Sequence, residues 1–337
     1  MKMSYAQNLE DYHLDLIFAG QSEGTYVDVG GGHPVADNVS FWFYLKGWCG
    51  LVIEPQVQLA AAYAGVRPRD TVYGGLAGRE DGSVDFHIVE GLHGLSSAVK
   101  ANAEGARQYG AAYRIEKKPM RPLSALIDDA RLTAIDFLKI DVEGAEPDVL
   151  AGLDLARHRP RLILVEAVNP NNRAGAVTAW EPALLASGYE FVFFDNLNRF
   201  YFAQEHAALK ARLPDKPAPW DCVAHLWDCG RAAEQPGHPD HALARALVTG
   251  LMAELPGLDP ALLARLIARG KSLEKSLAPL GLEALLRGKA EFPGQKGGQT
   301  HGSDPDIAGI AALLETDRVR AALGRIACMY DGGHLLE

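Results

Sequence analysis

Short apolar segments alternate with longer amphipathic ones over the N-terminal part of the chain. Runs rich in strand-forming residues lie at 25–30, 50–55, 70–78, 83–90, 135–144, 161–170 and 189–195. Segments long enough for crossover helices separate most of them, such as SFWFYLKGW (40–48) and PLSALIDDARL (122–132). Residues 162–165 are apolar at every position, as is typical of a strand that helices cover on both faces. The pattern predicts an α/β fold with a mostly parallel sheet.

The segment YEFVFFDNLNRFYFA (189–203) departs from this alternation, because it predicts two strands joined at Asn-Leu-Asn. A seven-stranded, mostly parallel sheet that ends in an antiparallel hairpin is typical of class I (Rossmann-like) methyltransferases. Beyond the proline-rich LPDKPAPW (213–220) the composition shifts to Ala and Leu, and a leucine every fourth residue marks a helix face. We expect these divisions: a first domain over 1–230, a helical extension over 231–337 with a leucine face at Leu243, Leu247 and Leu251, a linker near 292–305, and a last helix near 306–328.

Composition and charge exclude several classes of protein. The 337 residues carry a net charge of −10, which argues against a nucleic-acid partner, because phosphate binding needs concentrated Lys and Arg. The four cysteines show neither CxxC pairs nor zinc-site spacing. No apolar run is long enough for a membrane span, and the N-terminal MKMSYAQNLEDYHLDL lacks the apolar centre of an export signal. We therefore expect a cytoplasmic protein.

The stretch TYVDVGGGHP (25–34) ends a buried strand in three glycines, which let the backbone approach a ligand closely. A dinucleotide fingerprint would need a further glycine where Val35 stands. Asp28, on the strand, would repel a pyrophosphate but attract the ammonium and sulfonium groups of S-adenosylmethionine. The alternative is that Asp28 caps the loop amides. The next strand ends in VIEP, where Glu54 suits the two ribose hydroxyls of an adenosine, as in NAD sites; otherwise Glu54 is a solvated residue before a turn.

A third signal is DFLKIDVEGAE, in which Asp136 opens a strand and Asp141 lies near its end. Burying acids at the end of a parallel strand is costly unless they meet a ligand or cation, and ligands bind at that edge. The alternative is that the acids occupy a helix N-terminus, which suits Glu146 better than Asp141.

The segments SYAQNLEDYHL, TYVDVGGGHPVADNVSFWFYLKGWCGLVIEP, GLSS and IDFLKIDVEGAEPDVLAGL together resemble the FkbM family of S-adenosylmethionine-dependent methyltransferases, over roughly residues 4–203. The resemblance implies a class I methyltransferase fold and O-methylation, commonly of a sugar hydroxyl in a glycan or glycosylated natural product. Family members often have Ala or Asn in place of Gly31 and Gly32. The resemblance places these residues: Gln7, Glu10 and Asp11 in a cap over the cofactor, Asp28, Gly30 and Gly32 around its methionine part, Glu54 on the ribose, and Asp141 beside the reacting centre.

A sugar hydroxyl is a poor nucleophile, so it needs a base or a divalent cation beside it. Asp141 and Glu166, with Asn169 nearby, offer oxygen ligands of the kind Mg²⁺ accepts, although Glu166 could be only a polar strand terminus. His93 and His33 are the imidazoles nearest the expected pocket, and either is a base or merely solvated. We expect Asp141, Glu166 and His93 as the catalytic candidates.

Aromatic side chains in FWFYLKGW offer surfaces for sugar stacking or, at helical spacing, for the core. They are Trp42, Phe43, Tyr44 and Trp48. The EKKP segment (116–119) reads as an exposed charge run.

Two rival functions remain open. One is an NAD-dependent oxidoreductase, and the other is a catalytically idle cofactor-binding scaffold whose helical tail recruits a partner. For the C-terminal helices we separately expect that they close over the acceptor or form a homodimer, because their apolar faces must be buried.

Overall fold

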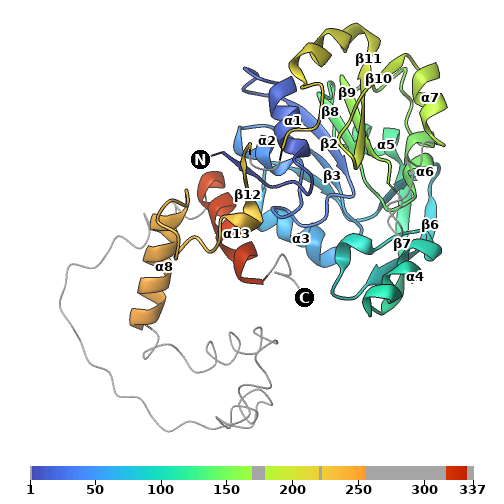
Figure 1. The fold of residues 1–337 in the computed structure, drawn as a ribbon. Coiled ribbons are helices and arrows are strands. Elements are labelled where there is room, and N and C mark those ends of the chain that lie inside the picture. Colours follow the sequence, from blue (N-terminus) through green and yellow to red (C-terminus); the bar gives the residue numbers. More distant parts are fainter. Residues whose placement is uncertain (1, 169–178, 220–221, 255–315, 332–337) are drawn as a thin grey trace.

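Within the described residues, which are 2–168, 179–219, 222–254 and 316–331 of a computed structural model, seven strands form the central sheet (Figure 1). Its spatial order is β10-β11-β9-β8-β2-β3-β4. The strands are β2 (Thr25–Val29), β3 (Cys49–Ile53), β4 (Thr71–Tyr73), β8 (Phe137–Ile140), β9 (Leu162–Glu166), β10 (Tyr189–Phe194) and β11 (Asn198–Ala203). All neighbours are parallel except β11, which runs antiparallel to both β9 and β10. The predicted α/β class with a mostly parallel sheet is confirmed.

Helices cover both faces of this sheet, as the all-apolar strands require. One face carries α1 (Glu10–Ile17), α2 (Phe41–Leu45) and α3 (Val57–Val66), and the other carries α5 (Leu123–Asp129), α6 (Glu146–Ala151) and α7 (Glu181–Ala186). Successive strand residues alternate between the two layers: Tyr26 packs in the first core cluster and Val27 in the second. Asp28 shares the face of Tyr26 and is fully buried there.

The aromatic residues of and after α2 belong to the core. Phe43 lies 4.8 Å from Trp48 and 5.0 Å from Phe137 between ring centroids. Trp42 and Tyr44 are also buried. The hypothesis that these rings stack on a sugar is wrong, because they already pack against one another.

A second, three-stranded sheet stands between β4 and α5 in sequence. It consists of β5 (Leu76–Gly78), β6 (Gly82–Val89) and β7 (Tyr113–Pro122) in the order β5-β7-β6, and the β6–β7 connection holds α4 (Lys100–Gly105) and the 3₁₀ helices His93–Leu95 and Ala106–Tyr109. Of the runs at 70–78 and 83–90, only residues 71–73 therefore join the main sheet. The interpretation of residues 116–119 as an exposed charge run is wrong in part: they lie in β7, and Lys118 is buried beside Glu116 at 2.7 Å.

Residues near the C-terminus pack onto the N-terminal part of the fold. β12 (Ala224–His225) pairs in parallel with β1 (Met3–Ser4), and α13 (Asp317–Asp331) lies against α3. Arg325 of α13 makes a bidentate, buried ion pair with Asp240 at 2.7 Å for both bonds. The remaining described helices are α8 (His241–Glu254) and the 3₁₀ helices Gln204–Arg212 and Leu226–Asp228.

The predicted division at residue 230 stays a prediction. Val223 and Ala321, on either side of it, share one core cluster with the N-terminal part of the fold. The leucine face of α8 is formed, and its Leu247 and Leu251 are exposed. The predicted linker at 292–305 lies outside the described residues. In the part of the chain that the structure describes, no helix has both the length and the apolar character needed to span a membrane.

Candidate functional site

The loops that follow β2, β3 and β8 enclose a cavity of about 680 Å³ at the carboxyl edge of the sheet. This is the edge at which open parallel sheets bind their ligands. The predicted residues Gln7, Gly30, Gly32, Glu54 and Asp141 all line the cavity. Apolar side chains of the smaller sheet complete the wall, among them Leu76, Phe86 and Met120.

The glycine loop lies directly against the backbone that follows β8. Gly30 has φ +81°, and a Cβ on it would come within 1.8 Å of the Asp141 carbonyl oxygen. The amides of Gly30 and Gly31 donate to the Ile53 carbonyl at 3.0 and 3.1 Å. Gly32 has φ +57°, and no atom lies within 4 Å of its Cβ position. The loop is thus held on its sheet side and open on the side of the cavity.

Glu54 is placed by two backbone amides at the tip of β3. Its carboxylate accepts from the Gly32 amide at 2.8 Å and from the Gln56 amide at 2.7 Å. The residue is only 2% exposed, so the alternative of a solvated glutamate is wrong. Burial raises the pKa of Glu54 to about 7, against the opposing effect of the two amides.

Asp28 lies beside a lysine that the sequence analysis did not include. Asp28 and Lys139 are register partners on β2 and β8, and both are buried. Ser40 donates its hydroxyl to Asp28 Oδ2 at 2.6 Å, while Oδ1 has no hydrogen-bond partner among the described residues. Burial raises the pKa of Asp28, and the Lys139 charge opposes the shift. The alternative that Asp28 caps the loop amides is wrong, since Ile53 and Glu54 accept from them.

Three acidic side chains meet beside the glycine loop. Asp141, Glu143 and Glu166 each offer one oxygen, and these oxygens lie within 4.8 Å of one another. Lys139 Nζ donates to Asp141 Oδ2 at 3.0 Å. Burial, followed by the neighbouring carboxylates, raises the pKa of Glu143 and of Glu166 well above its usual value. Glu166 therefore lies beside Asp141 in a form that favours the neutral acid, because burial and then Asp141 are the largest causes of its raised pKa.

Glu143 was missed as a site residue, although it lies two positions after Asp141. Its φ of +54° marks a sharp bend, and its Oε2 is buried without a hydrogen-bond partner in the part of the chain that the structure describes. Ser97 and Asn102 donate to its backbone carbonyl at 2.8 and 2.5 Å, which ties the GLSS segment to the acidic cluster. Glu146 is the first residue of α6, as the helix-terminus alternative predicts, and it accepts from the Val142 and Gly144 amides of the preceding loop at 3.1 and 3.0 Å.

Other predicted residues support the site from outside it. Within the described part, neither Glu10 nor Asp11 lines the cavity. Asp11 accepts from the Ser4 hydroxyl at 2.6 Å, and Glu10 accepts from the Asn8 amide at 2.6 Å. Both therefore shape the N-terminal segment that carries Gln7, rather than forming the cap surface itself.

The histidine hypotheses have different outcomes. His33 lines the cavity, but its Nδ1 accepts from the Val35 and Ala36 amides at 3.1 and 3.0 Å, so that nitrogen has a structural task. The side chain of His93 and the residue Asn169 lie outside the described part of the chain, and their roles stay predictions.

The buried acids predict a fall in stability with rising pH. Burial raises the pKa of Glu10 to about 8 and that of Glu54 to about 7, both above the values of an unfolded chain. An acid whose pKa is higher in the folded state binds more protons when folded, so ionising it opposes folding. We expect the free energy of unfolding of the ligand-free protein to fall by about 2 kcal/mol between about pH 6.5 and pH 8. Urea denaturation at both pH values measures it. Glu10→Gln should flatten the slope, and a stability that rises over this range would contradict the assignment.

The α/β fold has its cavity where the parallel strands end, the edge at which such sheets bind ligands. Residues 28–192, a little under half of the chain, match the family model of the methyltransferase FkbM domain. This match identifies the protein as a methyltransferase. S-adenosylmethionine is the methyl donor that this family uses in general.

A solved structure of methyltransferase FkbM from Methylobacillus flagellatus KT is similar at 16% sequence identity and a TM-score of 0.35. The similarity covers 57% of this chain and 50% of that chain, so it spans half the length of the solved protein. The comparison with curated proteins gives no match.

Proposed function

We propose that the protein transfers the methyl group of S-adenosylmethionine to a hydroxyl group of a sugar, glycan or glycosylated metabolite. The observation that carries this proposal is the position of Asp141. It lines the same cavity as the glycine loop and Glu54. It accepts a hydrogen bond from Lys139, and Glu166 lies beside it. A ligand site and an acid that can take a proton are thus adjacent. The match of residues 28–192 to the methyltransferase FkbM domain supports methyl transfer, and the resemblance to the FkbM family supports the sugar hydroxyl.

The cavity fits an adenosine-type methyl donor. Open space at the Gly32 Cβ position lets such a ligand approach the loop backbone, and Glu54, fixed by two amides, can accept from ribose hydroxyls. The donor, when bound, supplies an electrophilic methyl group on a positively charged sulfur. Asp28 and Asp141 are the acids nearest to Lys139 here, and the Lys139 ammonium offsets part of their negative potential.

Asp141 is the proposed base, and Glu166 is its positioning partner. The acceptor oxygen forms its bond to the methyl carbon as the bond from carbon to sulfur breaks, and the hydroxyl proton passes to the Asp141 carboxylate. The Lys139 ammonium holds Asp141 Oδ2 at 3.0 Å, which fixes the orientation of the carboxylate. Holding the reactants in line supplies much of the rate.

For Asp141 and Glu166, the predicted binding of Mg²⁺ is a weaker proposal than transfer of the acceptor proton to Asp141 without a metal. A divalent cation on these residues and Glu143 would require all three carboxyls to ionise, whereas burial favours the neutral form of Glu143 and Glu166. The Lys139 ammonium, already on Asp141, would also repel the cation. Methyl transfer that continues in EDTA supports proton transfer to Asp141 without a metal. Activity that is lost in EDTA and restored only by Mg²⁺ supports the metal.

Calorimetry with S-adenosylmethionine tests the ligand half of the proposal. Glu54→Gln removes the charge that accepts the ribose hydroxyls, so we expect affinity for the donor to fall by about 10- to 100-fold. Glu80→Gln is the matched control, because Glu80 also lines the cavity but is exposed. The affinity of this variant for S-adenosylmethionine should be unchanged. Tight binding of NAD with no response to S-adenosylmethionine would favour the oxidoreductase instead. Binding without methyl transfer to any of a panel of methyl glycosides would favour the scaffold.

A further inference from the structure

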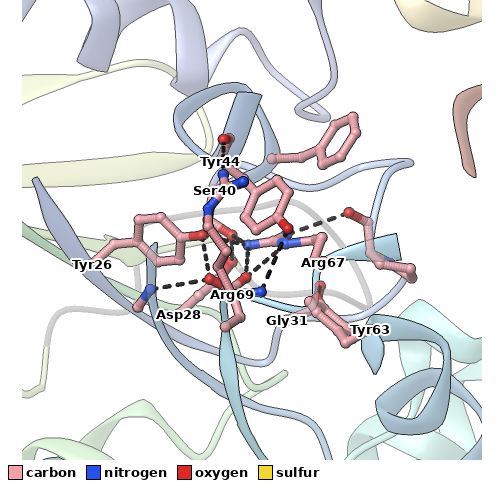
Figure 2. Close-up of polar contacts among 12 residues, drawn as sticks. Tyr26, Asp28, Gly31, Ser40, Tyr44, Tyr63, Arg67 and Arg69 are labelled. Carbon is pink, nitrogen blue, oxygen red and sulfur yellow. Dashed lines mark hydrogen bonds and ion pairs between the residues drawn. The ribbon is translucent and has the colours of Figure 1, made fainter. Parts of the chain in front are cut away.

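A fully buried arginine stands behind the glycine loop (Figure 2). Arg67 follows α3, has no exposed surface, and pairs with the equally buried Asp70 at 2.6 Å. The rings of Tyr26, Tyr44 and Tyr63 surround its guanidinium carbon at 4.9 to 5.7 Å. A buried ion pair is weak support for stability, because desolvation offsets most of the attraction. The location of Arg67 therefore asks for a further explanation.

The arginine reaches the site through two short chains of hydrogen bonds. In the first, Nη2 donates to Ser40 Oγ at 2.9 Å, and Ser40 donates to Asp28 at 2.6 Å. In the second, Nη1 donates to Asn38 Oδ1 at 2.9 Å, and the Asn38 amide donates to the Gly31 carbonyl at 2.8 Å. Both chains end on residues at the carboxyl end of β2, as Figure 2 shows for Asp28 and Gly31.

Tyr63, one of the three tyrosines whose rings surround Arg67, also contacts the Gly31 carbonyl. The Tyr63 hydroxyl donates to Gly31 O at 2.9 Å and accepts from the Asn38 amide at 3.1 Å. The Gly31 carbonyl is thus fixed by two donors that both lie next to Arg67.

Fixing this carbonyl also fixes the amide on the other side of the peptide bond. The carbonyl of Gly31 and the N–H of Gly32 belong to one planar trans peptide, so they point in opposite directions. With the carbonyl held toward Asn38 and Tyr63, the Gly32 N–H is directed at Glu54 Oε2, 2.8 Å away. The orientation of Glu54 therefore depends on contacts that begin at Arg67.

We propose that Arg67 is a positioning residue for the methyl donor: through Asn38 and Tyr63 it orients the Gly31–Gly32 peptide and hence Glu54, and through Ser40 it holds Asp28. The proposal rests on the proposed function, because it assigns Glu54 to the donor. Arg67 itself lies behind the cavity wall and does not touch the ligand.

Two tyrosines provide a matched test. Tyr63→Phe removes the hydroxyl on Gly31 and keeps the ring over Arg67, so we expect affinity for S-adenosylmethionine to fall about 5- to 10-fold by calorimetry. Tyr44→Phe removes a hydroxyl from a ring 5.3 Å from the Arg67 guanidinium carbon, against 4.9 Å for Tyr63. Among the described residues, the one hydrogen-bond contact of the Tyr44 hydroxyl is the Arg69 amide at 3.5 Å. This control should bind within about twofold of the unchanged protein. Arg67→Lys keeps the positive charge but loses the forked guanidinium that donates to both Asn38 and Ser40. In that variant, adding Tyr63→Phe should lower the affinity for S-adenosylmethionine by a smaller factor than it does alone.

The pH dependence of binding separates positioning from stability. The Gly32 amide lowers the pKa of Glu54, while burial and Asp28 raise it. Tyr63→Phe should therefore move the pH midpoint of donor binding upward, whereas a loss of stability alone would reduce the folded fraction and leave the midpoint in place.

Three results would overturn the proposal. If the unchanged protein does not bind S-adenosylmethionine, both the proposed function and this role are wrong. If it binds, and Tyr63→Phe and Arg67→Lys bind equally well, the positioning role alone is wrong. If Tyr44→Phe weakens binding as much as Tyr63→Phe, the tyrosines around Arg67 act by packing and not through the Gly31 carbonyl.

Discussion

Replacing Asp141 with asparagine is expected to lower kcat for methyl transfer by about 100- to 10,000-fold, the range that a positioned base supplies. Asparagine keeps the size of the side chain but cannot take the acceptor proton. It also removes the carboxyl group beside Glu166. The affinity for S-adenosylmethionine should change much less than kcat, because the ribose acid Glu54 and the glycine loop are untouched. Steady-state rates with the best acceptor from a panel of methyl glycosides, at saturating donor, measure the effect.

The control for this variant is Asp148→Asn. Asp148 lines the same cavity, but its side chain is 62% exposed and its ion pair with Arg79 is at the surface. Its loss should change kcat by less than about threefold, since exposed pairs contribute little. Asp141→Asn also removes an ionic partner of the buried Lys139, so the melting temperature of each variant should be measured beside its rate. A folded Asp141→Asn protein with full kcat would exclude Asp141 as the base.

The sequence predicted most of the main sheet because its strands are locally distinct. Runs such as residues 162–165 are apolar throughout, and the hairpin at 189–203 has its turn at the expected place. The smaller sheet was not separated from the main one, because a strand's partner is set by contacts distant in sequence. The strand β7 was missed for a related reason: the charged residues of its EKKP segment fit an exposed loop equally well, and pairing with β5 and β6 decides otherwise.

The candidate site was predicted where one residue type suffices to indicate the chemistry. Gly32, Glu54 and Asp141 line one cavity, as their places after successive strands suggested. Lys139 was not recognised, although a lysine inside the apolar run FLKI is a usable signal. Its significance depends on its register with Asp28, which no local pattern contains.

That register also corrects the electrostatic expectation. The positively charged methyl donor was the expected partner of the acids at this edge of the sheet. Lys139 already neutralises part of their charge in the absence of the donor. The two strands thus bury an acid and a base side by side, which lessens the cost of burying either.

Replacing Gly30 with alanine should have the largest effect on stability. The new Cβ would lie 1.8 Å from the Asp141 carbonyl oxygen, a backbone atom that no side-chain rotation can move away, and φ is +81°. The loop or the segment after β8 must therefore shift. We expect a loss on the order of 3–5 kcal/mol in the free energy of unfolding and no measurable binding of S-adenosylmethionine. Urea denaturation and calorimetry provide the two measurements.

Gly32→Ala separates the two effects. Gly32 also has positive φ, at +57°, but nothing lies within 4 Å of its Cβ position. Its replacement should cost only about 1–2 kcal/mol of stability, yet the added methyl group enters the cavity and should weaken donor binding clearly. If Gly30→Ala proved as stable as Gly32→Ala, the close contact between the glycine loop and Asp141 would not exist in solution. The proposed base would then no longer be placed beside the donor by the backbone.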